Sequence, residues 1–265
     1  MTMVKILKGE KLEEDGNDTL TVQELQSIYN YLNTNRESAY DDDSKRKMIR
    51  RLLKPEENPD SEIIQTQIDG IMRTEIFAWK IGQLEYAEGV REVYVTLSTD
   101  HIRNIPFRGS PQLISESAFG SLRIQLYRDK LLIFVYSPYM YIRQFQKVIR
   151  TMLREIGLNT LNVTWDSNAL AQIKQEDASR ILEEKVDGIE SRATVDMSAP
   201  DGLENTQIGE ELETQGRINK VTYISIEYPE NRVKIDGDKG IINTDLDERQ
   251  TILYIKEKLL PHSNY

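Results

Sequence analysis

The sequence predicts an α+β fold, in which a helical N-terminal part precedes a mostly antiparallel sheet with two strand–strand–helix units. Three patterns support this prediction. Apolar residues recur at intervals of three or four over most of residues 21–80, as in amphipathic helices. Apolar and polar residues alternate over 91–98, as in half-buried strands. Two strands followed by an amphipathic helix occur at 122–156 and again at 221–259.

The same patterns divide the chain into four consecutive regions. Over 191–216, serine, proline, glycine and glutamate replace the apolar periodicity, which is typical of an acidic linker or a long loop. The expected regions are a helical N-terminal region at 1–80, an α+β core at 81–190, this linker or loop at 191–216, and a C-terminal strand–strand–helix unit at 217–265.

In the N-terminal region we expect a short strand and then three helices. The first helix begins at a capping box, because the Thr21 hydroxyl accepts from a first-turn amide while Glu24 reaches back. The second helix follows three aspartates, which complement a helix N-terminus, and is rich in lysine and arginine. The expected elements are a strand at 4–6 and helices at 21–34, 44–54 and 61–80.

The core region is expected to contain a hairpin followed by a helix. Pro106 and Pro111 predict a loop before the hairpin. Ser137 and Pro138 predict the start of the helix, since serine caps helices and proline suits the first position. The expected elements are a strand at 91–98, a loop at 101–118, strands at 122–127 and 131–136, and a helix at 138–156.

The rest of the chain is expected to repeat the order of strands and helices. A short strand and a long helix complete the core region, and turns at Pro229 and at Asp236–Gly237 separate the later strands. The last helix starts near Asp245 and ends before Pro261. The expected elements are a strand at 161–165, a helix at 167–190, and strands at 221–228, 233–235 and 241–242.

Composition excludes several classes of function. The 265 residues carry a formal net charge of −10 and contain no cysteine. Disulfides, thiolate zinc sites, iron–sulfur clusters and cysteine nucleophiles are therefore excluded. The sequence contains no phosphate-binding loop, nucleophile elbow or zinc-protease motif. We therefore expect no cofactor, no metal site and no catalytic residue. Without an apolar run of about 18 residues, we also expect no membrane partner.

The net charge is an average over bands of opposite sign. Residues 44–54 and 101–157 each carry a net charge of +6, whereas 1–43, 55–100 and 158–216 carry −6, −7 and −9. The basic bands either face the acidic bands within one fold or bind a polyanion. Charge alone leaves both interpretations open.

The expected helix at 138–156 carries the most specific pattern. Arg143, Lys147, Arg150 and Arg154 follow one another at intervals of four, three and four, opposite the apolar stripe. Glu155 is the one acidic residue of this segment, so no acid lies one turn away from the stripe to neutralise it. Repeated cations suit a phosphate backbone, and nearby tyrosines suit stacking on bases.

We therefore predict a non-catalytic, intracellular, cytoplasmic protein that binds nucleic acid, DNA or RNA, through a basic helix face. One alternative is an assembly or adaptor subunit whose basic face docks an acidic protein, or a homo-oligomer. Another is a metal-dependent enzyme that acts on nucleic acid, for which His101 is the best single polar candidate. The predicted binding residues are Arg50, Arg51, Arg103, Arg108, Arg123, Arg128, Lys130, Arg143, Lys147, Arg150 and Arg154.

Overall fold

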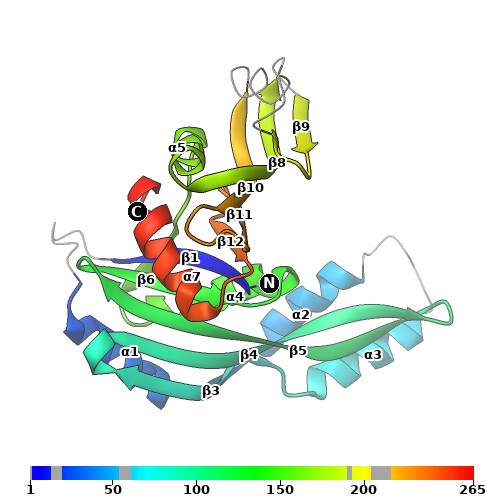
Figure 1. The fold of residues 1–265 in the computed structure, drawn as a ribbon. Coiled ribbons are helices and arrows are strands. Elements are labelled where there is room, and N and C mark those ends of the chain that lie inside the picture. The colour runs from blue at the N-terminus through cyan, green and yellow to red at the C-terminus, as the bar shows by residue number, and fades with distance from the viewer. Residues whose placement is uncertain (1, 13–19, 54–60, 190–192, 204–215) are drawn as a thin grey trace. The chain divides into compact units, whose positions relative to one another are not determined.

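The computed structural model describes residues 2–12, 20–53, 61–189, 193–203 and 216–265 (Figure 1). The chain forms two compact units, each assembled from separate segments. We call the unit made of Lys11–Asp129 and Met140–Leu158 the hairpin unit. We call the unit made of Met1–Glu10, Lys130–Tyr139 and Asn159–Tyr265 the terminal unit.

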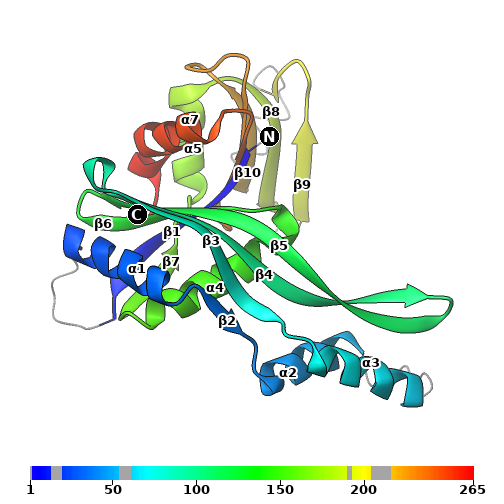
Figure 2. The same cartoon turned by 90° about the horizontal axis from the view of Figure 1, so that it is seen from below.

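The hairpin unit is built on an antiparallel sheet with the strand order β2–β3–β4–β5. Its two long strands, β4 and β5, pair along their whole length, from Glu92 opposite Gln125 to Phe107 opposite Ser110, and form an extended ribbon (Figure 2). The strands are β2 (Glu37–Ala39), β3 (Phe77–Ala87), β4 (Glu92–Phe107) and β5 (Ser110–Tyr127).

Four helices pack on this sheet: α1 (Val22–Thr34), α2 (Asp42–Leu52), α3 (Ser61–Arg73) and α4 (Ile142–Arg154). Helix α1 contacts β3, β4 and β5, and α4 contacts β4. Helices α2 and α3 pack together against the distal part of the ribbon, where Ile49 and Ile71 meet Ile102 and Leu113 in a buried apolar cluster. The helices thus bury apolar faces on two stretches of one ribbon.

The terminal unit contains a second run of strands, in the order β6–β1–β12–β11–β10–β8–β9, and β7 pairs with β1 beside this path. Helix α5 (Ser167–Asp177) contacts β8 and β10, and α7 (Glu248–Tyr254) continues into a π-helical turn at Ile255–Leu259 and a 3-10 turn at Leu260–His262. The strands are β1 (Thr2–Lys11), β6 (Lys130–Tyr136), β7 (Leu158–Asn162), β8 (Ala178–Ile189), β9 (Ala193–Ser198), β10 (Arg217–Ser225), β11 (Arg232–Asp236) and β12 (Ile241–Thr244).

A buried polar network joins α5, β10 and α7 in the terminal unit. The carboxylate of Asp177 accepts hydrogen bonds from Tyr254 Oη and from Ser225 Oγ, the latter at 3.0 Å. The hydroxyls of Tyr223 and Tyr254 lie 2.6 Å apart. Burial raises the pKa of both tyrosines, so both stay protonated and hydrogen-bonded. The network satisfies polar groups inside the core and leaves none of them exposed to a ligand.

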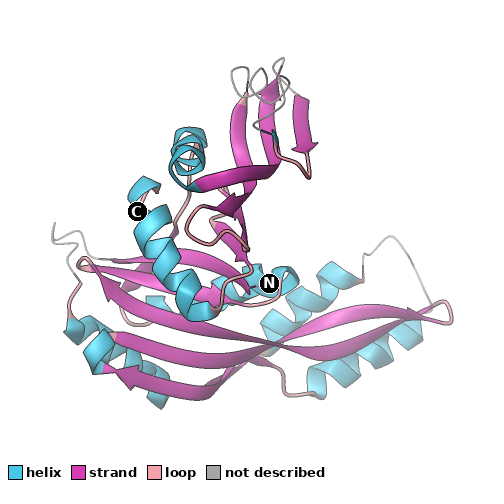
Figure 3. Ribbon diagram, viewed as in Figure 1, coloured by secondary structure: helices cyan, strands magenta, loops and turns pink. Residues whose placement is uncertain are grey.

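The predicted fold class is wrong, because the N-terminal part is not helical. The chain begins with β1, and β2 and the start of β3 also lie before residue 80. The described residues form twelve strands with helices interspersed among them, as Figure 3 shows by the magenta strands and cyan helices. Local periodicity detects each helix separately but does not report the strand pairings that assemble the sheet.

Two predictions are wrong for the ribbon and for the segment that precedes it. The helix expected over 61–80 ends at Arg73, and Trp79 instead lies in β3. The loop expected over 101–118 is instead the distal half of the ribbon. Pro106 and Pro111 lie opposite each other near its turn, where the missing amide donors disrupt few ladder hydrogen bonds.

Three further predictions about helices and loops are also wrong. The helix expected over 167–190 ends at Asp177 and continues as β8. The helix expected over 138–156 begins at Ile142, after a 3-10 turn at Tyr139–Tyr141, so Ser137 does not cap it. In the expected linker, 193–198 form β9, which pairs with β8, while 204–215 lie outside the described residues. The predicted capping box of Thr21 and Glu24 is confirmed.

Candidate nucleic-acid interface

Helix α4 is strongly amphipathic, with one buried apolar face, and within the hairpin unit it contacts β4. At its start, the Gln144 amide donates to Thr99 Oγ1 at 2.9 Å and to the Asp100 carbonyl at 3.0 Å, which anchors the helix on β4. The left-handed Gly157, with φ of 77°, follows its end. The apolar face consists of Ile142, Phe145, Val148, Ile149, Met152 and Leu153, all of them buried. This anchoring leaves the opposite face of α4 turned outward.

The outward face carries the predicted basic stripe. Arg143, Lys147 and Arg154 are exposed, and none of them forms a side-chain ion pair with another described residue. Arg150 belongs to the same stripe but is half-buried and has a further contact. We use the name α4 stripe for Arg143, Lys147 and Arg154. An exposed cation without an acidic neighbour keeps its full attraction for an incoming anion.

Two predicted binding residues are neutralised within the fold. Arg123 Nη1 pairs with Glu92 at 2.5 Å, and its guanidinium lies 4.7 Å from the centre of the Tyr94 ring. Arg103 Nη1 pairs with Glu116 at 2.8 Å. These arginines form ion pairs between neighbouring strands of the ribbon, so carboxylates within the fold already neutralise their charges.

Two other predicted arginines lie at tight turns. Arg108 and Arg128 are exposed and adopt left-handed backbone conformations, with φ of 51° and 49°. Arg108 lies over the Phe107 ring at 5.3 Å, and Arg128 lies over the Tyr127 ring at 5.2 Å. Arg108 lies just before the long strand β5 and Arg128 just after it, so the length of the strand separates the two arginines.

The remaining predicted residues lie elsewhere. Arg50 and Arg51 are exposed on α2, which packs at Ile102 and Leu113, whereas α4 is anchored at Thr99 and Asp100. Lys130 belongs to the terminal unit, where it lies over the Tyr265 ring at 5.0 Å.

His101 takes part in a cluster that joins the ribbon to the start of α4. Its Nε2 lies 3.4 Å from Glu116 Oε2, and its ring centre lies 4.9 Å from that of Tyr141. Tyr141 Oη donates to the other oxygen of Glu116 at 3.3 Å. The hydrogen bond from Arg103 lowers the pKa of Glu116, so this carboxylate stays charged and lies in contact with all three side chains. His101 therefore has a structural role, in which it connects the ribbon to the start of α4 through non-covalent contacts.

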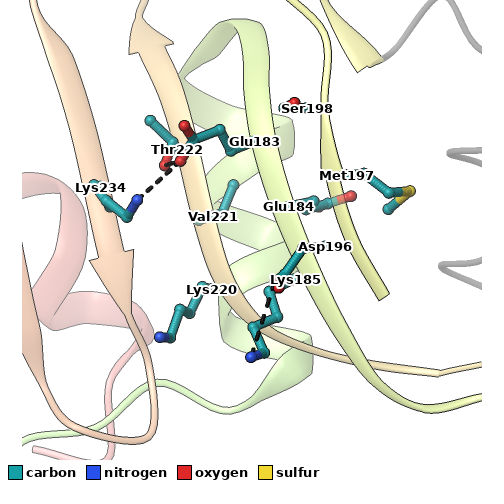
Figure 4. Close-up of a pocket in the computed structure, with 10 residues that line it drawn as sticks. All are labelled: Glu183, Glu184, Lys185, Asp196, Met197, Ser198, Lys220, Val221, Thr222 and Lys234. Atoms are coloured by element: carbon teal, nitrogen blue, oxygen red, sulfur yellow. Dashed lines mark hydrogen bonds and ion pairs between the residues drawn. The ribbon is translucent and has the colours of Figure 1, made fainter. Parts of the chain in front are cut away.

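Sequence reasoning missed a pocket of about 380 Å³ in the terminal unit, lined by β8, β9, β10 and β11 (Figure 4). Three lysines on this face have carboxylate partners, and the bond from Lys234 lowers the pKa of Glu183. The charges of the pocket are thus largely balanced, and it has no strong preference for an anion. The pairs are Lys234–Glu183 at 2.9 Å, Lys220–Asp236 at 3.2 Å and Lys185–Asp196 at 3.9 Å.

Sequence reasoning also missed a groove between α2 and α3, to which Arg46 and Arg73 contribute together with Arg50. The signal in the sequence was the spacing of Arg46 and Arg50, which are four residues apart and thus lie on one helix face. Arg73 is distant in sequence and joins them only because α2 and α3 pack together.

The part of the chain that the structure describes holds no group of three or more histidine, aspartate or glutamate side chains placed to bind a metal ion. Among the described helices, none is both long and apolar enough to cross a membrane. No protein-family model, curated protein or solved structure matches this chain. A functional conclusion therefore depends on the chemistry of the surfaces themselves.

Proposed function

We propose that the protein binds nucleic acid through the α4 stripe, without catalysing a reaction on it. The observation that supports this proposal is the absence of an acidic partner for Arg143, Lys147 and Arg154 among the described residues, although the chain as a whole has a net charge of −10. Cations at helical spacing fit successive phosphates of a backbone, whose charge supplies most of non-specific affinity.

The anchoring of α4 also suits this role. Its buried face and the Gln144 contacts hold the helix in place, so the backbone that carries the three cations loses little conformational freedom on binding. The proposal places the protein inside the cell, where nucleic acid is available. The chain has no cysteine and therefore does not rely on disulfides formed in an oxidising compartment.

A charge-reversal experiment tests the proposal. The triple variant Arg143→Glu, Lys147→Glu, Arg154→Glu is compared with the wild type by fluorescence anisotropy on labelled duplex DNA, single-stranded DNA and single-stranded RNA at low salt. We expect the wild type to bind at least one of these probes. We expect the triple variant to bind it at least about tenfold more weakly, a difference of about 1.4 kcal/mol.

A matched control separates the α4 stripe from overall charge. Arg180, Arg217 and Arg249 are exposed in the terminal unit, and their triple replacement by glutamate changes the net charge by the same amount. We expect this control to bind the probe nearly as well as the wild type. The proposal is wrong if the wild type binds none of the probes at low salt, or if both triple variants lose affinity equally.

A further inference from the structure

The α2–α3 groove is a second surface of the hairpin unit with a different chemistry. Helices α2 and α3 lie side by side in both views of the ribbon (Figures 1 and 2), and a cavity of about 630 Å³ runs between them. Its floor is apolar and consists of the buried Ile49 with the half-buried Ile68 and Met72. A methionine in such a floor adapts its shape to different apolar side chains.

The rim of the groove is positively charged. Arg46, Arg50 and Arg73 line it, are exposed, and form no ion pair with any other residue that the structure describes. Two aspartates also line the groove, but both have partners. Asp42 lies 3.5 Å from Lys45 Nζ, and Asp69 accepts a hydrogen bond of 2.9 Å from Gln65. Gln65 is neutral, so Asp69 keeps its charge. Three guanidinium groups against two carboxylates, one of which also lies beside Lys45, leave the groove with an excess of positive charge.

The combination of an apolar floor and an arginine rim defines the ligand. A free phosphate or a nucleic-acid backbone has no apolar side to place on Ile68 and Met72, whereas an amphipathic peptide has one. Carboxylates on the edges of such a peptide match the guanidinium groups, which favour bidentate pairing. The lining residues of α3 run from Gln65 to Arg73, which at 1.5 Å per residue spans about 12 Å and fits about two turns of a helical segment.

We propose that the α2–α3 groove binds an acidic, amphipathic segment of a partner protein. The apolar side chains of the segment pack on Ile49, Ile68 and Met72, and its carboxylates pair with Arg46, Arg50 and Arg73. This is the helix-in-groove mode of recognition, in which apolar anchors provide affinity and charges at the rim select the partner. The inference does not depend on the α4 stripe.

Selection from a random peptide library displayed on phage, with the full-length protein as bait, tests this inference. We expect enrichment of sequences in which leucine, phenylalanine or methionine recur at intervals of three or four and aspartate or glutamate lie between them. A synthetic peptide of the most enriched sequence is then titrated into the protein and its variants. The double variant Arg50→Glu, Arg73→Glu should bind it at least about tenfold more weakly.

Lys47→Glu, Arg51→Glu is the matched control, because both residues are exposed on α2, neither lines the groove, and the double reversal changes the net charge by the same amount. Thermal unfolding of each variant shows whether it is folded, and Ile68→Asp provides a second test that acts on the floor instead of the rim. The inference fails if no acidic, amphipathic sequence is enriched, or if the double variant binds the peptide as the control does. It also fails if duplex DNA displaces the peptide and the double variant loses DNA binding.

Discussion

On one face of the terminal unit, the lysines of β8, β10 and β11 each form an ion pair with a carboxylate, whereas in the hairpin unit the α4 stripe forms none with the described residues. Both surfaces present three or more cations, so a count of charges does not distinguish them. The arrangement of the acids does, because a carboxylate in contact removes most of the attraction that a lysine exerts on a ligand.

The origin of the difference lies in the secondary structure. On a sheet, side chains of neighbouring strands stand opposite each other, so Lys185 meets Asp196 and Lys234 reaches Glu183 across strands. On a helix, the neighbours of a cation come from positions three or four away, and in α4 those positions are not acidic around Arg143 and Lys147. The pattern of acids along α4 therefore decides that its stripe stays open to a ligand.

The strongest test of charge pairing in the terminal unit concerns its buried ion pair. Lys174 pairs with Glu184, and their side chains are 7% and 0% exposed. We expect Lys174→Met to lower the free energy of unfolding by about 3–5 kcal/mol, because it leaves a buried carboxylate without its cation. Denaturation in guanidinium chloride measures this loss. The double variant Lys174→Met, Glu184→Leu should recover most of it, and no recovery would show that the pair is not the cause.

The second test compares the two surfaces as ligand sites. Replacing Lys185, Lys220 and Lys234 by glutamate changes the net charge of the protein by the same amount as replacing the three residues of the α4 stripe by glutamate. We expect less than about a twofold change in nucleic-acid affinity from the first set and at least about tenfold from the second. Fluorescence anisotropy with one probe and one buffer compares them. Equal losses of affinity in the two triple variants would show that pairing with a carboxylate does not determine which cations bind nucleic acid.

The third test concerns Arg108 at the turn of the ribbon. Arg108 and Gly109 both have positive φ values, of 51° and 83°, and asparagine followed by glycine is preferred in such a turn. We expect Arg108→Asn to raise the free energy of unfolding by about 0.5–1 kcal/mol, since asparagine tolerates the left-handed region better than arginine. Thermal unfolding measures the gain. Arg108→Ala keeps the unfavourable conformation, so the same gain in that variant would contradict the explanation.

The smallest expected effect concerns Glu24 in the capping box of α1. Burial raises the pKa of Glu24, but hydrogen bonds from Thr21 and Lys11 outweigh it and lower the pKa from 4.5 to about 2. A lowered pKa means that the charged carboxylate stabilises the fold above its unfolded pKa, and that this contribution is lost as pH falls toward 2. Because Glu24 is at the surface, with 27% of its side chain exposed, water screens these interactions and we expect a contribution of less than about 1 kcal/mol.

Comparison with Glu24→Gln isolates that contribution, because glutamine keeps the shape of the side chain without its charge. The wild type should be more stable than the variant near neutral pH, and the difference in unfolding free energy should shrink as pH falls below 4.5. Chemical denaturation at several pH values measures it. A difference that is independent of pH would show that the charge of Glu24 has no part in the cap.

The sequence predicted local features better than their assembly. The capping box at Thr21 and the apolar stripe of α4 are confirmed, because both depend on residues close together in the chain. The ribbon was missed, since Pro106 and Pro111 indicate a loop until their pairing across the ribbon is known. Trp79 fits a helical period as well as a strand, and its pairing with Ser38 places it in β3.

The same limit applies to the candidate interface. The α4 stripe follows from spacing within one helix, whereas the neutralisation of Arg123 by Glu92 joins residues 31 positions apart. Likewise, Arg73 joins Arg46 and Arg50 only through the packing of α3 on α2. A sequence shows which cations lie on one helix, and the structure is needed to show which of them have partners.

The salt dependence of binding tests the central proposal most directly. For duplex DNA, three cations that contact phosphates predict that log K falls with log salt at a slope of about −3, and replacing one of them by a neutral side chain makes the slope shallower by about 1. We expect Lys147→Gln to show this change and Lys220→Gln, in the paired set, to leave the slope unchanged. The same slope in the wild type and both variants, or no binding at low salt, would contradict the account.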